Sequence, residues 1–174
     1  QLDTFEPGSS FPDCHVITCI ELYSGYRNAR VVESHSAADA LAAYMDLIER
    51  PYGRPRRVFV DNGREFLGDF KAHFDTSLTE LKSGLPYNHN QVARDERSHR
   101  GLNDVLAHML LRAGAPPSNK AEMQRWLDAA MLSFNATPST LPTAGHLSAY
   151  ELLFLARPLA PLAAAVDTGL GRKV

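Results

Sequence analysis

The chain has 174 residues, 44% of them hydrophobic, and its 18 Lys and Arg against 20 Asp and Glu give a formal net charge of -2 at pH 7. This composition excludes intrinsic disorder and suits a single domain with its own core. No apolar stretch approaches the about 20 residues of a membrane-spanning helix. No basic segment followed by an apolar run opens the chain, so we expect no signal peptide. Because it begins at Gln1, we expect a fragment of a longer protein. The near-neutral charge alone gives no support to nucleic-acid binding, since domains that bind nucleic acids are usually basic.

The first part of the chain is expected to form strands. Residues 1–5, 14–22 and 26–32 are predicted strands, and Ser24-Gly25 turns the chain between the second and the third. Cys14 and Cys19 are five positions apart in the second of these, so they should point to opposite faces of the sheet. We therefore expect small buried thiols and no disulfide.

The hydrophobic period then changes to that of a helix. Ser36 and Asp39 form a capping-box pattern that predicts a helix start. The apolar face of this helix would hold Ala38, Leu41, Met45 and Ile48. Prolines and a glycine at 51, 53 and 55 end it, and residues 57–60 read as a short strand.

The remaining elements complete an α/β pattern. Phe66, Phe70 and Phe74 recur every four residues and predict a short helix, and residues 78–81 predict a fifth strand. Longer helices are expected over 92–111 and 123–134, and a last short one over 148–156. Three strands, a helix, a strand, a helix, a short strand and then helices predict a mixed sheet with helices on both faces.

Three acidic residues occupy positions that suit metal-ion chemistry. Asp3 lies in the first expected strand, Asp61 directly follows the strand at 57–60, and Glu96 lies near the start of the long helix. In α/β folds, ligands gather at such positions. Carboxylates that converge repel one another unless cations lie between them, and Mg²⁺ suits this arrangement because it keeps sites for phosphate and water. Composition and periodicity alone do not make the three residues converge.

Each candidate also has a simpler interpretation. Asp61 opens Asp-Asn-Gly, an ordinary turn sequence, and Glu96 is a carboxylate of the kind that a helix N-terminus favours. Asp95 is an alternative third acid, although at about 100° per residue it points nearer the apolar face of the helix. Arg97 and Arg100 also fit a solvated basic face.

Three segments follow one another along the chain: Gln1-Leu-Asp3-Thr4, then Val58-Phe-Val-Asp61-Asn-Gly-Arg-Glu-Phe66, then Pro86-Tyr87 followed by Asp95-Glu96-Arg97-Ser-His99-Arg100. They resemble the catalytic core of retroviral and retrotransposon integrases, of the DDE superfamily. Phe134-Asn-Ala-Thr-Pro138 and Ser148-Ala-Tyr-Glu-Leu-Leu-Phe154 resemble the closing helices of gypsy-type and gammaretrovirus-like integrases. The resemblance covers residues 1–158 and leaves 159–174 as an Ala-, Pro- and Gly-rich tail or linker.

The resemblance implies a fold and a set of site residues. The fold would be RNase H-like, an α/β fold with a five-stranded mixed sheet flanked by helices. Catalysis would rest on Asp3, Asp61 and Glu96 as ligands of two Mg²⁺ or Mn²⁺ ions, with Asp3 touching both. DNA contacts would come from Tyr87, in the loop that approaches DNA ends, and from Arg97 and Arg100, which can meet phosphates as charged forks.

The resemblance also implies an activity and partners. The chain would be a two-metal-ion polynucleotidyl transferase and endonuclease that trims a DNA 3′ end and joins it to target DNA. Zinc-binding and basic domains would flank it in the full-length protein, so this core alone should bind DNA weakly. We expect a homodimer or higher homo-oligomer through helices at 37–48 and 123–134, no membrane association, and a nuclear location in a eukaryotic host.

Two other interpretations stay open at this point. The chain could be a captured, inactive integrase-like module that binds DNA or protein, and retention of all three carboxylates argues against this. Alternatively it could be the core of a bacterial DDE transposase, and the closing helices argue against that one.

Overall fold

A computed structural model describes residues 1–8, 10–11, 14–83, 89–138 and 146–154, with only the backbone at 89–95. The strands are β1 (Leu2–Phe5), β2 (His15–Ile20), β3 (Arg27–Val32), β4 (Arg57–Val60) and β5 (Glu80–Ser83). The helices are α1 (Ala37–Tyr44), a π-helical turn η1 (Met45–Glu49), α2 (Arg50–Tyr52), a 3₁₀ turn η2 (Arg64–Phe66), α3 (Asp69–Asp75), α4 (His89–Ala113), α5 (Lys120–Ala136) and α6 (Ala149–Phe154). The expected α/β class is confirmed.

The strands form two hydrogen-bonded units rather than one continuous sheet. β1, β2 and β3 make an antiparallel ladder in which Asp3 lies opposite Thr18. β4 and β5 pair in parallel. β1 lies beside β4, but no ladder joins them. The expectation of a single five-stranded sheet therefore needs correction. Both strands at the junction are only four residues long and offer few ladder bonds to each other.

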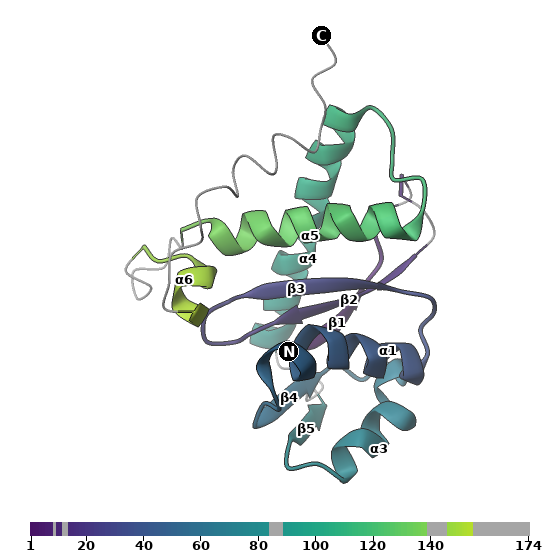
Figure 1. The fold of residues 1–174 in the computed structure, drawn as a ribbon, viewed down its shortest axis with the longest axis vertical. Coiled ribbons are helices and arrows are strands. Elements are labelled where there is room, and N and C mark those ends of the chain that lie inside the picture. Colours follow the sequence, from purple (N-terminus) through teal and green to yellow (C-terminus); the bar gives the residue numbers. More distant parts are fainter. Residues whose placement is uncertain (9, 12–13, 84–88, 139–145, 155–174) are drawn as a thin grey trace.

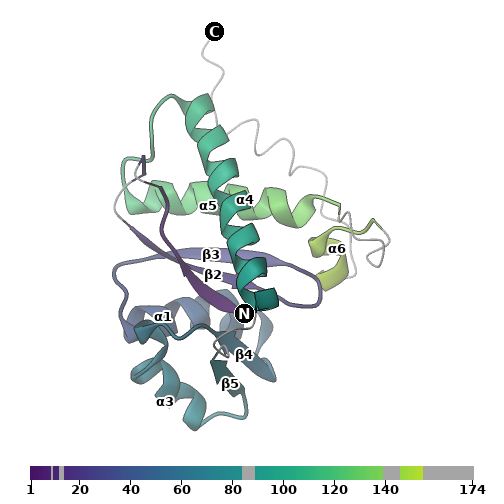
Figure 2. The same cartoon turned by 180° about the vertical axis from the view of Figure 1, so that it is seen from behind.

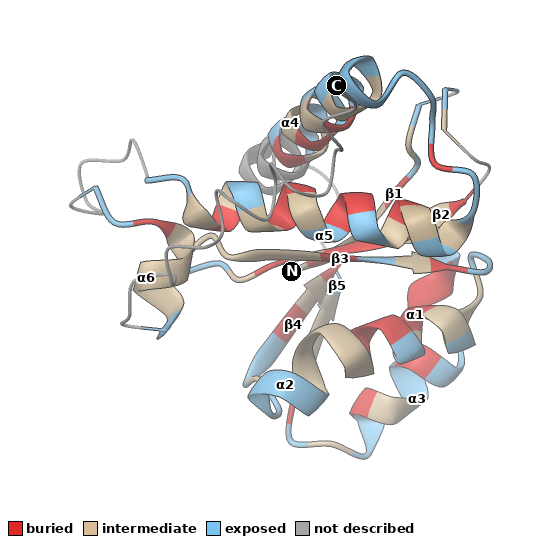
Figure 3. Ribbon diagram, turned by 45° about the horizontal axis from the view of Figure 1, so that its top comes forward, coloured by how far each residue is buried: buried red, intermediate tan, exposed pale blue. Residues whose placement is uncertain are grey.

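Helices cover both faces of the antiparallel unit (Figures 1 and 2). α4 and α5 cover one face, where Phe5 and Val16 of the sheet join Leu102, Leu106 and Leu127 in one buried cluster. The opposite face packs on α1 and α3 in a second cluster. Buried residues of these two helices are among the red segments of Figure 3. The second cluster contains Leu2, Ile17, Ala43, Tyr44, Val58, Val60, Phe66, Phe70 and Phe74.

The side chains of the two cysteines point to opposite faces of the sheet. Cys14 belongs to the cluster under α4 and α5, and Cys19 packs against the cluster under α1. Neither thiol forms a disulfide. The prediction of opposite faces and no disulfide is confirmed, because side chains alternate across the sheet.

The start of α1 confirms half of the expected capping box. Ser36 is the N-cap, and its hydroxyl accepts the Asp39 N–H at 3.1 Å. The Asp39 carboxylate instead accepts from the N–H and the hydroxyl of Ser34, at 2.9 and 2.7 Å. The inward face is centred on Ala40, Ala43 and Tyr44, so Ala38 is exposed and its assignment to the apolar face is wrong.

The predicted phenylalanine helix is present in two pieces. Phe66, Phe70 and Phe74 are all buried, with successive ring centroids 5.1 Å apart. Gly68 separates η2 from α3 because its φ of +54° lies in the region that favours glycine. β5 begins at Glu80 rather than at 78, and Leu78 is fully exposed. The prediction of the fifth strand was therefore two residues too early.

The long helices are confirmed and extend beyond their predicted ends. α5 begins at an Asn119 cap, whose side chain accepts the Glu122 N–H. The boundary proposed at residue 158 and the tail beyond it lie outside the described residues. Within the described part of the chain, no helix combines the length and the apolarity that crossing a bilayer requires.

Candidate active site

Asp3 stands on β1 on the face that α4 covers. The β1 alternation gives it the same face as Phe5, which lies in the cluster under α4 and α5. Its carboxylate accepts the Thr4 N–H at 2.8 Å, and its side chain is 20% exposed. Asp3 is therefore partly covered by α4 and still open to solvent on one side.

His99 of α4 connects that helix to Asp3. Its Nε2 lies 3.1 Å from the Thr18 hydroxyl and 3.7 Å from Asp3 Oδ2, and its ring centroid lies 5.1 Å from that of Phe5. The Thr18 hydroxyl also donates to the Asp3 carbonyl oxygen at 3.2 Å. Because that hydroxyl has one proton, Nε2 must be the donor to Thr18, which fixes the imidazole tautomer.

The charge state of His99 is decided by its surroundings. A carboxylate 3.7 Å away favours the charged imidazole, whereas burial opposes it. Burial is the dominant influence and lowers the pKa of His99 below its ordinary value. At neutral pH we therefore treat His99 as a neutral hydrogen-bond donor that fixes α4 over the first two strands.

Glu96 lies one helical turn before His99, so the two residues share a side of α4. It is exposed, as are Arg97 and Arg100. Seen from behind in Figure 2, the N-terminal end of α4 lies over the start of β1. The structure thus brings the Glu96 turn of the helix to the strand that carries Asp3.

Asp61 follows the last residue of β4 and shapes the turn there. Its Oδ1 accepts the Gly63 N–H at 3.0 Å. Although the residue is exposed, partial loss of water around its carboxyl raises the pKa of Asp61, and the Glu65 carboxylate raises it further, while the Gly63 bond lowers it. Asp61 is thus an acid whose negative charge is poorly compensated by its surroundings.

Glu65 is an acidic neighbour that the sequence did not single out. It is 8% exposed, an unusual burial for a glutamate. A Cβ on Gly63 would lie 2.6 Å from the Glu65 carboxyl carbon, so the carboxyl occupies the space that any other residue at 63 would fill. The glycine in Asp-Asn-Gly therefore admits a second acid beside Asp61. Its place within the motif Asp-Asn-Gly-Arg-Glu was the available sequence signal.

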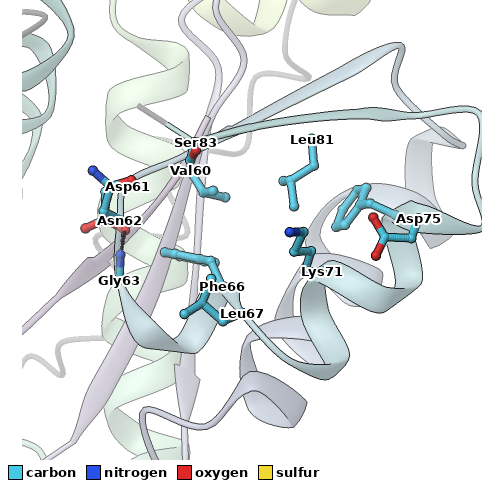
Figure 4. Close-up of a pocket in the computed structure, with 11 residues that line it drawn as sticks. Val60, Asp61, Asn62, Gly63, Phe66, Leu67, Lys71, Asp75, Leu81 and Ser83 are labelled. Carbon is cyan, nitrogen blue, oxygen red and sulfur yellow. Dashed lines mark hydrogen bonds between the residues drawn. The ribbon is translucent and has the colours of Figure 1, made fainter. Parts of the chain in front are cut away.

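A cavity of about 350 Å³ opens beside Asp61 (Figure 4). Asp61 and Ser83, at the ends of the two parallel strands, lie at one side of it, and Lys71 and Asp75 of α3 lie at the other. The remaining lining is Val60, Asn62, Gly63, Phe66, Leu67, Phe74 and Leu81. A polar rim over an apolar floor gives a solute access to the Asp61 carboxylate.

The three predicted carboxylates stand on neighbouring elements. β1 lies beside β4, and α4 contacts β1 through His99. Their oxygens do not lie together within 4.8 Å in the described part of the chain. The side chain of Asp95 is not described, and Tyr87 lies outside the described residues.

Comparison with known proteins was made by sequence and by structure. No model of a protein family matches the chain, and neither does any curated protein sequence. Solved structures do match. The catalytic core domain of BIV integrase aligns over 98% of this chain and 97% of its own, with a TM-score of 0.65 and 20% identity.

A second similar structure is the intasome of simian T-cell lymphotropic virus in complex with the PP2A regulatory subunit B56 gamma. It aligns over 92% of this chain with a TM-score of 0.71 and 16% identity. This chain spans 55% of that chain's length. At these identities the likeness establishes a shared fold. The chain has the fold of retroviral integrase catalytic cores.

Proposed function

We propose that the chain is the catalytic core of a DDE integrase, which trims DNA 3′ ends and transfers them to target DNA. The single observation that supports this most is the arrangement of Asp3, Asp61 and Glu96. They come from β1, from the end of β4 beside it, and from α4, which contacts β1 through His99, in a fold shared with retroviral integrase cores.

The donor set fits hard divalent cations. Mg²⁺ and Mn²⁺ prefer carboxylate oxygens and open coordination positions. The raised pKa of Asp61 and the proximity of Glu65 indicate surplus negative charge at the end of β4, which a cation would neutralise. When bound, two such ions would neutralise charge at the reacting phosphorus and favour ionisation of the attacking hydroxyl.

The protein's own residues would hold and orient the reactants. Asp3, Asp61 and Glu96 supply oxygen ligands from three separate elements. His99 would act as a positioning residue, because its Nε2 bonds the Thr18 hydroxyl and lies 3.7 Å from Asp3 Oδ2, which holds α4 over the first two strands. Arg97 and Arg100, both exposed beside Glu96, would meet DNA phosphates. Tyr87 would lie in the preceding DNA-facing loop.

The test is a disintegration assay on branched DNA with Mn²⁺, using the whole chain. We expect product from the unmodified protein and at least a hundredfold less from Asp3→Asn, Asp61→Asn and Glu96→Gln. Asp75→Asn is the matched control, because it removes an exposed carboxylate from the far side of the cavity beside Asp61. Activity that survives Glu96→Gln but is lost in Asp95→Asn would show that the third acid is misassigned.

A non-catalytic module is the second candidate, and one observation favours it. The three carboxylates are not gathered within 4.8 Å of one another. An inactive module would show neither product nor any Mn²⁺-dependent change in thermal stability. A bacterial transposase core would instead act on transposon ends in preference to retroelement ends.

Several finer points belong to the same proposal. We place the chain nearest the gypsy-type and gammaretrovirus-like integrases, in a nucleus, between zinc-binding and basic flanking domains. We also propose a homo-oligomer. The inward faces of α1 and α5 are buried in the two clusters, so association through these helices would use their outer faces.

A further inference from the structure

A group of two histidines and a glutamate lies at the end of the antiparallel unit away from the three acids. Glu6 directly follows β1, His15 begins β2, and His35 lies between β3 and α1. By strand alternation Glu6 leaves β1 on the face opposite to Asp3. The group therefore belongs to the α1 side of the sheet and is separate from the proposed active site.

The three side chains point their ligand atoms at one another. Glu6 Oε1 lies 3.2 Å from His35 Nε2 and 4.0 Å from His15 Nδ1. The two imidazole centroids are 3.9 Å apart, with the rings tilted by 55°. One ligand atom from each residue lies within 4.8 Å of the other two, and in the described part of the chain no other three His, Cys, Asp or Glu do so.

His15 has a nitrogen in need of a partner. Its Nδ1 is shielded from solvent and makes no hydrogen bond in the described structure. Buried polar nitrogens are almost always satisfied, so such an atom facing a carboxylate and a second imidazole needs an explanation. A bound cation provides one, because the free electron pair of a neutral imidazole nitrogen is then its ligand.

The spacing matches a first-row transition metal. Ligands at 2.0–2.1 Å in a tetrahedron stand about 3.3 Å apart. Glu6 and His35, which share a hydrogen bond at 3.2 Å, already lie close to this separation, and the Glu6–His15 separation is within an ångström of it. Two imidazoles and one carboxylate suit zinc, whereas Mg²⁺ favours oxygen ligands alone.

We propose that Glu6, His15 and His35 bind one zinc ion, with water in the fourth position. The ion would fasten the end of β1, the start of β2 and the segment between β3 and α1 to one another. Because Glu6 and His35 are exposed, the ion can enter from solvent without any opening of the core. This site does not depend on the proposed catalytic function.

The test measures zinc binding by the metal-free chain with calorimetry, and the ligand-field absorption of Co²⁺ as a zinc substitute. We expect one tight site, tetrahedral Co²⁺ bands and a higher melting temperature with zinc. His15→Asn and His35→Asn should weaken zinc binding at least tenfold and abolish those bands. Excess Mg²⁺ should not displace the ion.

Two further variants make the result decisive. His108→Asn is the matched control, because His108 is an exposed histidine of α4 whose ring bonds the Asp104 carbonyl oxygen of the same helix. Glu6→Gln keeps the shape of an exposed side chain, so weaker binding in this variant cannot be attributed to misfolding. Zinc binding that is absent, or unchanged in His15→Asn and Glu6→Gln, would overturn the proposal.

Discussion

Substitution of Asn135 should weaken the contact between α5 and β3 and lower the free energy of unfolding. It is 2% exposed, near the end of α5. Its Oδ1 accepts the Arg27 N–H and its Nδ2 donates to the Arg27 carbonyl, both at 2.8 Å. Asn135→Ala removes both bonds and leaves the two main-chain groups of Arg27 without this partner.

The size of the effect follows from the two bonds. Each contributes a net stability of about 0.5–1.5 kcal/mol, and Arg27 is only partly covered, so water can replace part of the loss. We expect the free energy of unfolding to fall by about 2 kcal/mol. In a domain of this size that corresponds to a decrease in melting temperature of about 4–8 °C.

The measurement is urea unfolding followed by circular dichroism, paired with a thermal scan. Asn103→Ala is the control, because Asn103 is an exposed residue of α4 and alanine is a better helix former. If Asn135→Ala costs less than about 0.5 kcal/mol, the range of an ordinary surface change, then these bonds do not hold α5 to β3 and the reasoning is wrong.

Three further substitutions have defined outcomes. Asp61→Asn keeps an acceptor for the Gly63 N–H. Because the folded-state pKa of Asp61 is raised, ionisation of its carboxyl costs stability as the pH rises. Without divalent ions, the melting temperature of the variant should therefore exceed that of the parent at neutral pH, and the difference should vanish in acid. Phe70→Ala empties a fully buried site and should cost about 3–5 kcal/mol in urea unfolding. Gly101→Ala should stabilise the chain by about 0.5–1 kcal/mol in the same assay, because glycine inside a helix is destabilising relative to alanine. The new methyl fits, since it would meet Phe134 at an ordinary 3.6 Å.

Local pattern predicted the elements well where one physical signal dominated. The spacing of Phe66, Phe70 and Phe74 predicted burial on one face, and all three are buried. The pattern did not show that Gly68 would break the helix between the first two, because a positive φ depends on how the chain must turn to pack. Leu78 was assigned to a strand by its apolar character, but strand pairing with β4 begins later, at Glu80.

The candidate site divides in the same way. Resemblance selected Asp3, Asp61 and Glu96, and whether these residues hold metal is still a prediction. The local sequence pattern did not predict contacts between segments that are distant in the sequence. The His99–Thr18 bond joins residues 81 positions apart, so nothing near either residue in the sequence predicts it.

The side-chain amides of Gln124 and Asn135 on α5 also affect whether another chain can pair with the edge of the sheet. β3 is an edge strand of its ladder, and Gln124 binds the Val31 N–H and the Ala29 carbonyl just as Asn135 binds Arg27. The outward main-chain groups of β3 are thus already occupied along most of its length. A second chain cannot add a strand there, which guards this edge against aggregation.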